Sequence, residues 1–198
     1  MRRVVVDEWM SLDGVVQAPG NPTEDTTGGF PHGGWHLPYF DEMSQNWVVD
    51  YLTDAGGFLL GRRTYEILGG YWATNASEEE RVVAEPLNSK PKFVASTTLQ
   101  EPLEWQNSSL LRGDLAEAVG TLKLQDGGDL HVIGSTRLVH GLIQNGLVDE
   151  FRLMIDPVVL GDGKRLFPDD GTLRSLRLVE SHVTTTGAIL ARYLSGEG

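Results

Sequence analysis

The chain has 198 residues, of which 40% are hydrophobic and 22% are charged, and its 16 Lys and Arg residues against 28 Asp and Glu residues give a formal net charge of -12. This composition is typical of one globular domain, and no segment approaches the roughly 20 uninterrupted apolar residues that a membrane span needs. A strong acidic excess repels phosphate backbones, so we expect neither a nucleic acid nor a membrane as a partner.

The sequence contains no cysteine. Its absence excludes disulfide scaffolds, thiol nucleophiles, iron–sulfur clusters and cysteine-based zinc sites. The N-terminus lacks the apolar run and cleavage site of a secretory signal, which predicts a cytoplasmic protein. His32 and His36 are four residues apart, but the glycine pair between them disfavours a helix, so we expect no metal site.

The first third of the chain alternates strand and helix patterns. A β-branched run predicts a strand from Val4 to about Met10. Residues 18–34 are rich in Pro, Gly, Thr and Asn, which predicts a surface loop long enough to be a lid or a binding loop. Apolar residues at helical spacing then predict a helix over residues 40–55, and a short buried strand follows at 58–60. A helical turn is expected to begin at Tyr65.

The rest of the chain continues this alternation. Capping boxes predict two further helices, which begin at Ser77 and at Asp114. Strands are expected at 92–96, 130–133 and 151–155, and a helix at 138–143. Residues 176–184 and 188–194 form a predicted hairpin around Gly187. The sequence therefore predicts a single α/β domain over residues 1–198, with a mostly parallel central sheet, flanking helices and a C-terminal antiparallel hairpin.

Three segments that directly follow strands contain glycines, hydroxyls or arginines. They are Gly61-Arg62-Arg63-Thr64, Ser96-Thr97-Thr98 and Gly134-Ser135-Thr136. Ligands of open α/β sheets bind beyond the carboxyl ends of the strands, and helix N-termini and arginines bind phosphate. The second segment has hydroxyls where a NAD-binding site would carry a carboxylate, so it would accept a 2′-phosphate. Taken singly, each segment is explained as well by an ordinary cap or a polar strand end.

The order of these segments resembles the dihydrofolate reductase-like superfamily, and specifically the reductase domain of the bifunctional riboflavin-biosynthesis deaminase-reductase. The matching segments are Ser11-Leu12-Asp13-Gly14, Leu60-Gly61-Arg62-Arg63-Thr64-Tyr65-Glu66, Ile133-Gly134-Ser135, Leu147-Val148-Asp149-Glu150 and residues 157–167. The resemblance covers nearly the whole chain. It implies a dihydrofolate reductase-like three-layer domain with about eight strands that binds NADPH and delivers hydride to a pyrimidine- or pterin-like substrate. Within the family, the activity resembled is that of 5-amino-6-(5-phosphoribosylamino)uracil reductase.

Two departures from the family narrow the substrate. True dihydrofolate reductases carry a substrate-gripping carboxylate two residues after the proline that matches Pro38, where this chain has Phe40. Asp41 follows, but a shift of one residue rotates a helical side chain by about 100°, which should point it away from the substrate. Riboflavin reductases usually carry a lysine where this chain has Asp7. A separate expectation concerns the deaminase partner domain of this family. We expect none in this chain, because its zinc site needs cysteines and the chain has no cysteine.

The expected substrate contacts lie near the first strand. Asp13 follows this strand, where a carboxylate could orient a heterocycle or relay a proton, although stabilisation of its own turn explains it equally well. Trp9 and Trp35 could stack on a planar ring. Under the resemblance we add Gly161 to the substrate contacts and treat Asp13 as the candidate catalytic residue.

Two hypotheses from different classes remain open. The first is an NADPH-dependent reductase, in which the protein aligns cofactor and substrate. The second is a nucleotide- or ligand-binding module of the same fold without turnover, since fold does not establish activity. Apolar residues of the C-terminal hairpin further predict a homodimer with a two-fold contact at its outer face or edge.

Overall fold

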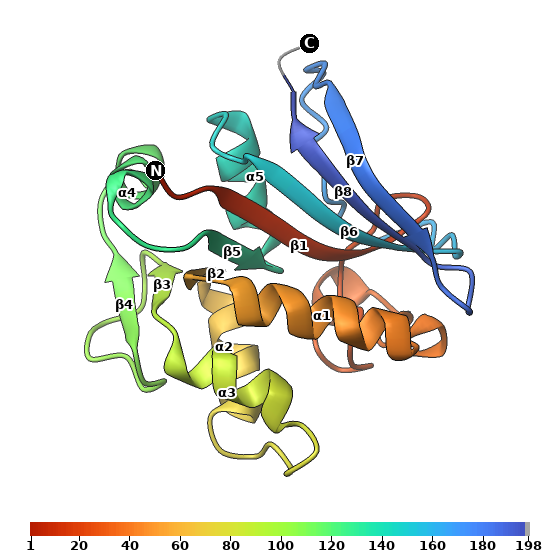
Figure 1. Cartoon of the computed structure of the whole chain (residues 1–198), viewed down its shortest axis with the longest axis horizontal. Helices are drawn as coiled ribbons and strands as arrows, with labels where there is room; N and C mark the ends of the chain where they lie inside the picture. The colour runs from red at the N-terminus through yellow and green to blue at the C-terminus, as the bar shows by residue number, and fades with distance from the viewer. Residues whose placement is uncertain (197–198) are drawn as a thin grey trace.

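The computed structural model describes residues 1–196, so residues 197 and 198 of the expected domain lie outside the described residues. One eight-stranded sheet runs through it in the order β4-β3-β2-β5-β1-β6-β8-β7 (Figure 1). The strands are β1 (Val4–Ser11), β2 (Gly57–Gly61), β3 (Lys92–Ala95), β4 (Ser108–Leu111), β5 (Leu130–Ile133), β6 (Glu150–Asp156), β7 (Leu176–Val183) and β8 (Ile189–Ser195). Strands β1 to β6 pair in parallel, and β7 and β8 are antiparallel. The predicted fold class, with its C-terminal hairpin, is confirmed.

Five α-helices form the two outer layers. They are α1 (Glu42–Asp54), α2 (Arg62–Trp72), α3 (Arg81–Ser89), α4 (Leu115–Leu124) and α5 (Thr136–Gln144). Helices α1, α2 and α3 pack on one face of the sheet, and α4 and α5 pack on the other, so each face has its own hydrophobic core. No helix within residues 1–196 is long and apolar enough to cross a membrane.

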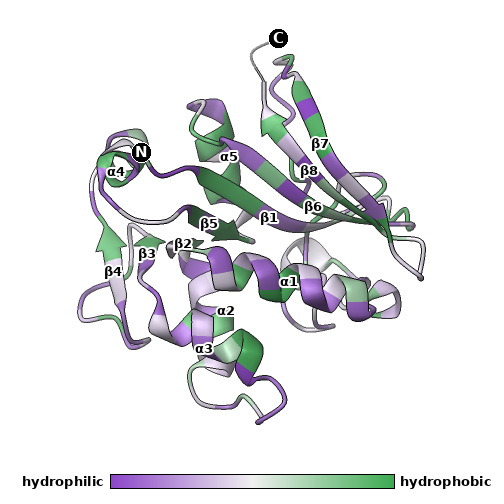
Figure 2. Cartoon of the chain, viewed as in Figure 1, coloured by the Kyte–Doolittle hydropathy of each residue, from purple (hydrophilic) through white to green (hydrophobic). Residues whose placement is uncertain are grey.

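The first half of β1 is apolar on both faces of the sheet, as expected for a strand in the middle of it. Val4, Val5 and Val6 are all buried, and the strand pairs in parallel with β5 on one side and β6 on the other. A strand buried on both faces reads as a continuous apolar run instead of an alternating pattern. Figure 2 shows this as green along the first half of β1 and along β5, whereas α1 alternates between green and purple.

Helix starts follow the expected caps in one case and not in the other. The Asp114 carboxylate accepts hydrogen bonds from the backbone N–H groups of Ala116 and Glu117, so α4 begins where its cap predicts. The expected helix start at Ser77 is wrong. There the Glu80 carboxylate accepts the Ser77 N–H, as in a capping box, but the Ser77 hydroxyl also donates to Glu80 instead of capping the helix, and α3 begins only at Arg81.

The segment 18–34 is more firmly held than a simple surface loop. Its Ala18 and Phe30 are buried with Val15 and Trp35 in a small hydrophobic cluster outside the two main cores. A short 3-10 helix at Thr27–Gly29 lies within it. The loop is therefore anchored at both ends beside the carboxyl edge of the sheet, which is where a binding site is expected.

Candidate functional site

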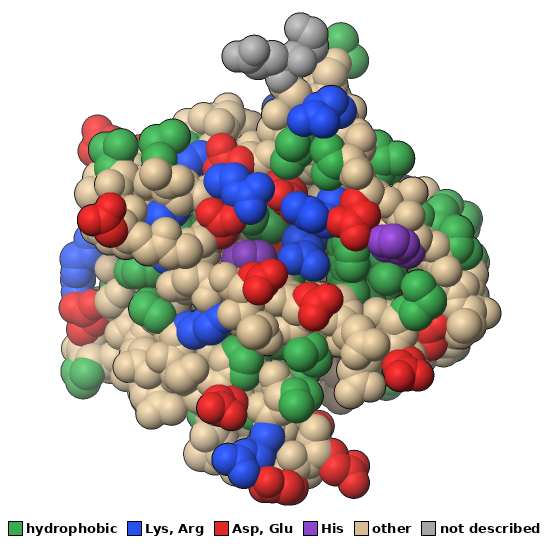
Figure 3. Space-filling view, viewed as in Figure 1, with side chains coloured by type: hydrophobic (Ala, Val, Ile, Leu, Met, Phe, Trp, Pro, Cys, Tyr) green, Lys and Arg blue, Asp and Glu red, His purple; other side chains and the backbone are tan. Residues whose placement is uncertain are grey.

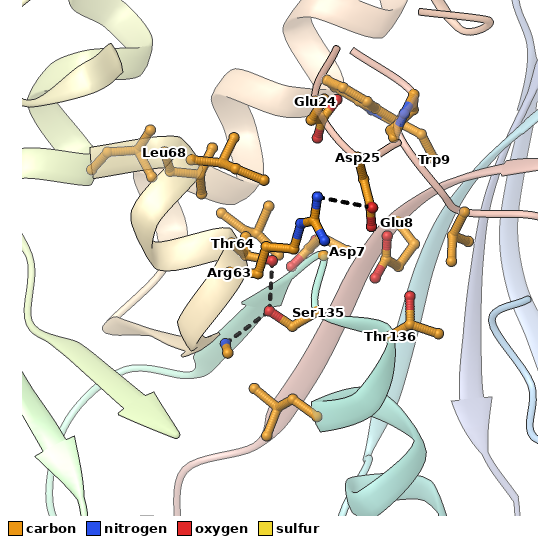
Figure 4. Close-up of a pocket in the computed structure, with 18 of the residues that line it drawn as sticks. Asp7, Glu8, Trp9, Glu24, Asp25, Arg63, Thr64, Leu68, Ser135 and Thr136 are labelled. Carbon is orange, nitrogen blue, oxygen red and sulfur yellow. Dashed lines mark hydrogen bonds and ion pairs between the residues drawn. The ribbon is translucent and has the colours of Figure 1, made fainter. Parts of the chain in front are cut away.

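A cavity of about 1120 Å³ opens at the carboxyl ends of β1, β2, β3 and β5. All ten residues expected to bind the cofactor line it, namely Gly61, Arg62, Arg63, Thr64, Ser96, Thr97, Thr98, Gly134, Ser135 and Thr136. Trp9, expected to contact substrate, lines it too. Figure 4 shows that Arg63 and Thr64 come from the start of α2, and Ser135 and Thr136 from the start of α5. The topology thus brings three strand ends that are far apart in the sequence to one site.

Ser135 joins the N-termini of the two helices. Its hydroxyl oxygen accepts the backbone N–H of Gly61 at 2.8 Å, and its O–H donates to the Thr64 hydroxyl at 2.7 Å. A Cβ at position 61 would come within 2.8 Å of this oxygen, so only glycine allows the approach. The first N–H groups of α2 and α5 therefore lie at one wall of the cavity, an arrangement suited to a diphosphate.

The backbone before α5 is left-handed at two successive residues. Gly134 has φ 60° and Ser135 has φ 70° and ψ 59°. A left-handed conformation is strained for serine, and the hydroxyl contacts with α2 offset this cost.

The second segment, Ser96-Thr97-Thr98, presents hydroxyls beyond β3. The Ser96 hydroxyl oxygen accepts the N–H groups of Thr98 and Leu99 at 3.1 and 3.0 Å, which folds the chain into a turn at the cavity. No carboxylate belongs to this segment. The composition of this segment therefore fits both a ribose that carries an additional phosphate and an unmodified ribose.

Arg63 is already paired across the cavity. Its guanidinium lies 3.0 Å from the Asp25 carboxylate of the loop, and the Lys164 ammonium binds the other oxygen of Asp25 at 2.5 Å. Burial alone would raise the pKa of Asp25, but hydrogen bonds from Lys164 and Thr27 lower it below its usual value. Asp25 and Lys164 were not anticipated from sequence, because neither belongs to a strand end.

The part of the cavity under α1 is mainly aromatic and apolar. Trp9, Phe40, Trp47, Tyr51 and Met154 line it, and the Arg152 guanidinium lies 4.6 Å from the centre of the Trp47 ring. This half offers a planar, largely dry surface that is complementary to an aromatic heterocycle.

The carboxylate next to Phe40 points away from the cavity, as expected, but Asp41 is the extended N-cap residue of α1 (φ -126°, ψ -174°), so the rotation along a helix that the sequence suggested is not the cause. Asp41 caps α1 by accepting the Ser44 N–H, and its second oxygen accepts the N–H and hydroxyl of Thr185. Hydrogen bonds from Thr185 and Ser44 lower the pKa of Asp41. Helix α1 therefore supplies no acid to the aromatic half.

Two acidic side chains that the sequence did not mark line the cavity instead. Glu8 is in the middle of β1, just past its pairing with β5, and its Oε1 has no hydrogen-bond partner. Glu24 lies in the loop and accepts the N–H groups of Gly20 and Asn21. Burial raises the pKa of both carboxyl groups. An acidic residue within an otherwise buried strand was the available signal for Glu8.

Three expected substrate contacts are not among the described residues that line the cavity: Asp13, Trp35 and Gly161. The Asp13 carboxylate accepts the Ser11 hydroxyl and the N–H groups of Leu160 and Gly161, at 2.7, 3.1 and 2.9 Å. The Trp35 indole N–H donates to the Gln17 carbonyl, and the indole ring packs in the small hydrophobic cluster of the loop. Asp13 therefore lies in a turn, where nearby donors already bind its carboxylate. Trp35 lies in the core of the loop, where apolar neighbours already surround its ring.

Two buried histidines are each paired with one acidic side chain. His36 Nδ1 is 2.7 Å from Asp156, and its ring stacks on Trp9 with centroids 4.2 Å apart. His131 pairs with Asp7 at 2.7 Å. Within residues 1–196, no three His, Asp or Glu side chains come together as a metal-binding group.

Comparison with known proteins identifies the family. The pattern of the RibD C-terminal domain matches residues 2–190. The chain belongs to the RibD C-terminal domain family. The uncharacterized protein YyaP of Bacillus subtilis (strain 168) is 30% identical over 194 residues, which are 97% of this chain and 94% of YyaP.

Solved structures share the fold at lower identity. A putative riboflavin biosynthesis protein from Shewanella sp. PV-4 has a TM-score of 0.69 at 19% identity, over 98% of this chain and 99% of its own. Dihydrofolate reductase from Enterococcus faecalis, complexed with NADP(H), has a TM-score of 0.60 at 14% identity, over 98% and 97% of the two chains. This RibD C-terminal domain protein thus has the dihydrofolate reductase-like fold expected from its sequence, and it is related to reductases.

Proposed function

We propose that the protein is an NADPH-dependent reductase of a small pyrimidine- or pterin-like heterocycle. The observation that carries the proposal is the convergence of two helix N-termini, the glycine at position 61 and two arginines in one cavity whose other half is aromatic. Helix N-termini and arginines favour a diphosphate and a further phosphate, and the aromatic half favours planar rings. When bound, NADPH supplies the hydride.

The protein's own contribution is mainly alignment. Ser135 holds the two phosphate-binding helix ends together, and Trp9 with Phe40 walls the substrate half. Because α1 carries no acid toward that half, recognition of a folate by the usual carboxylate is disfavoured. A smaller heterocycle fits the site better.

Cofactor choice tests the proposal directly. The extra phosphate of NADPH gains charge-assisted hydrogen bonds and meets no carboxylate at Ser96-Thr97-Thr98, so calorimetry should give roughly tenfold to a hundredfold tighter binding than for NADH. Arg62→Ala and Arg63→Ala should weaken NADPH more than NADH if that arginine reaches the 2′-phosphate. If it holds only the diphosphate, both cofactors should weaken equally.

Arg174→Ala is the matched control, because Arg174 pairs with Asp170 on the connection before β7 and does not line the cavity. Its affinities should equal those of the unmodified protein. Equal binding of NADH and NADPH by the unmodified protein, or binding of neither, would contradict the cofactor assignment.

A second candidate is a ligand-binding module without turnover, favoured by the missing acid on α1. Incubation with NADPH and a panel of pyrimidines and pterins, followed by cofactor absorbance, separates the two. Oxidation that depends on an added heterocycle supports the reductase. Binding of NADPH without oxidation across the panel supports the binding module.

A further inference from the structure

Glu8 is a buried acid that faces the cavity and has no partner. Its side chain comes from the middle of the central strand β1, one residue past the last pair with β5 (Asp7 with Ile133), and the residue is 7% exposed. Its Oε1 is buried without a hydrogen bond. Figure 4 shows the carboxyl group among the lining side chains, with Asp25 and Thr136 on either side of it in this view.

The other acids around the cavity are already committed or lie at its rim. Asp7 pairs with His131, Asp25 with Arg63 and Lys164, and Glu24 accepts two backbone N–H groups. Glu80 accepts the Tyr71 and Ser77 hydroxyls, and Glu79 is exposed. A polar group that is buried without a partner is costly, so an unpartnered acid aimed into a cavity points to a ligand.

The surroundings of Glu8 favour its neutral form. Burial raises the pKa of Glu8 well above its usual value, and the nearby charges of Asp7 and Glu24 raise it further. The basic residues that line the cavity are Arg62, Arg63, Arg137, Arg152 and Lys164. Of these, Arg63 and Lys164 bind Asp25, Arg62 lies near Glu66, and Arg152 lies near Asp7.

Resting on the proposed function, we propose that Glu8 is the proton donor of the reduction, and that the substrate is a heterocycle whose C=N bond places its nitrogen against this acid. The absence of an acid on α1 leaves this role open, and Glu8 lines the same cavity from β1, just past the point where β5 ends. A neutral carboxyl group can donate a hydrogen bond to a ring nitrogen that an ionised one would repel.

In the reduction of a C=N bond, the substrate carbon accepts the hydride of NADPH with its electron pair, and the π electrons of C=N move onto nitrogen. That nitrogen takes the proton from Glu8 as the O–H bond breaks. The products are NADP⁺, the C–N single-bonded substrate and ionised Glu8, which regains a proton from solvent.

The protonation state of Glu8 is tested without substrate by infrared spectroscopy. Glu8→Gln should remove one protonated-carboxyl C=O band at pH 7, whereas Glu85→Gln, on the exposed face of α3, should remove none. Glu8→Asp should keep a carboxyl band. A spectrum unchanged by Glu8→Gln would overturn the proposal. So would failure of this variant to fold, because glutamine matches the neutral acid in shape and charge.

Kinetics test the step itself with NADPH and a panel of heterocycles that contain C=N bonds. For any compound reduced, Glu8→Gln should lower kcat by about 10²- to 10⁴-fold while the affinity for NADPH changes less than about twofold. The kcat of the unmodified enzyme should fall tenfold per pH unit above the pKa of Glu8, and the variant should lack this decline.

The two proposals fail in distinguishable ways. If calorimetry shows NADPH binding and the Glu8→Gln variant turns over at the unmodified rate, the inference fails and the reductase function stands. If NADPH does not bind, the reductase function fails, and the proton-transfer step fails with it, whatever the infrared spectrum shows.

Discussion

At the scale of single residues, Asp13 connects two segments that are distant in the chain. Its carboxylate binds the backbone of Leu160 and Gly161, 147 and 148 residues away, and thereby fixes the segment after β6 against the end of β1. Burial by itself would raise its pKa, but these bonds and that from Ser11 lower the pKa of Asp13 to about 2. Its role in the structure is to hold the wall beside the site.

We expect Asp13→Asn to destabilise the fold and leave cofactor binding intact. The two backbone N–H groups bind different oxygens of Asp13, and asparagine replaces one of these oxygens by an N–H₂ group that cannot accept, so the free energy of unfolding should fall by about 1–3 kcal/mol at pH 7. Because the folded pKa is depressed, this difference should be complete above the ordinary value of 3.8 and disappear as the pH falls toward about 2. Urea unfolding at several pH values measures it. An NADPH affinity that drops tenfold or more would contradict a purely structural role.

Glu8 should have the opposite effect on stability. Its folded pKa is raised above the ordinary 4.5, so the folded state binds more protons between that value and the folded pKa. The stability of the unmodified protein should fall with rising pH in this window, by at most about 1.4 kcal/mol per pH unit, relative to Glu8→Gln. The difference between two urea titrations isolates Glu8 from Asp7, Glu24 and Asp156. Parallel stability curves would show that Glu8 is ionised in the fold.

At the scale of elements, the two helix starts at the cavity are coupled through one hydroxyl. Ser135 is on α5, and both of its partners are at the start of α2. A helix N-terminus is an effective anion site only when its N–H groups are held toward the ligand. The link therefore fixes two such sites relative to each other before any ligand binds.

Two substitutions separate the hydroxyl from the backbone strain. Ser135→Ala should lower the free energy of unfolding by about 1–3 kcal/mol, because it leaves the Gly61 N–H without its acceptor. Ser135→Gly loses the same hydrogen bonds but relieves the left-handed backbone, so it should be about 1 kcal/mol more stable than the alanine variant. Calorimetric titration should show weaker NADPH binding in both. Unweakened binding in both would show that the link does not organise the site.

The sequence could predict the elements whose apolar pattern is strong. The strands β1 and β5 and the hairpin are apolar enough to be placed within a residue or two, and the three segments after strands do meet at one cavity. Strand β4 was not predicted, because Ser108–Leu111 is a short, half-exposed edge strand that begins with two serines. Pairing with β3, and not its own pattern, makes it a strand.

The candidate site could be predicted only where it depends on chain order. Residues after strand ends are located by topology, so the half of the cavity that we propose to bind phosphate could be assembled from sequence. Asp25 and Lys164 enter through long-range ion pairs 139 residues apart, which no local pattern contains. The sequence could not separate the two roles of Asp13, because a carboxylate in a turn after a strand has the same local signature whether it meets substrate or backbone.

At the scale of the whole molecule, the helix-free side of the hairpin half carries a row of ion pairs. Arg3 binds Glu150, Glu150 binds Arg192, and Arg192 binds Glu180, which also contacts His182. Figure 3 shows these colours gathered over β1, β6 and β8. Exposed apolar side chains remain on and beside the edge strand β7, including Leu178 and Val183.

A homodimer through β7 remains our proposal for assembly. An exposed edge strand with apolar side chains is a ready pairing surface, and two-fold contacts are the commonest. Light scattering should give the mass of two chains for the unmodified protein and of one chain for Leu178→Lys or Val183→Lys, with NADPH affinity unchanged. A one-chain mass for the unmodified protein at working concentration would rule the dimer out.

The sharing of Asp25 by two cations has a consequence for how a ligand enters. A phosphate that binds the Arg63 Nη2 now paired with Asp25 displaces that carboxylate, so binding at this nitrogen is an exchange of anions and its net gain is the difference between two ion pairs. Asp25 keeps Lys164 when Arg63 leaves it, so the displaced carboxylate is not stranded. The loop can therefore stay bound to Lys164 through Asp25 while Arg63 exchanges one anionic partner for the other. A ligand can then bind and dissociate while the loop wall of the cavity keeps its place.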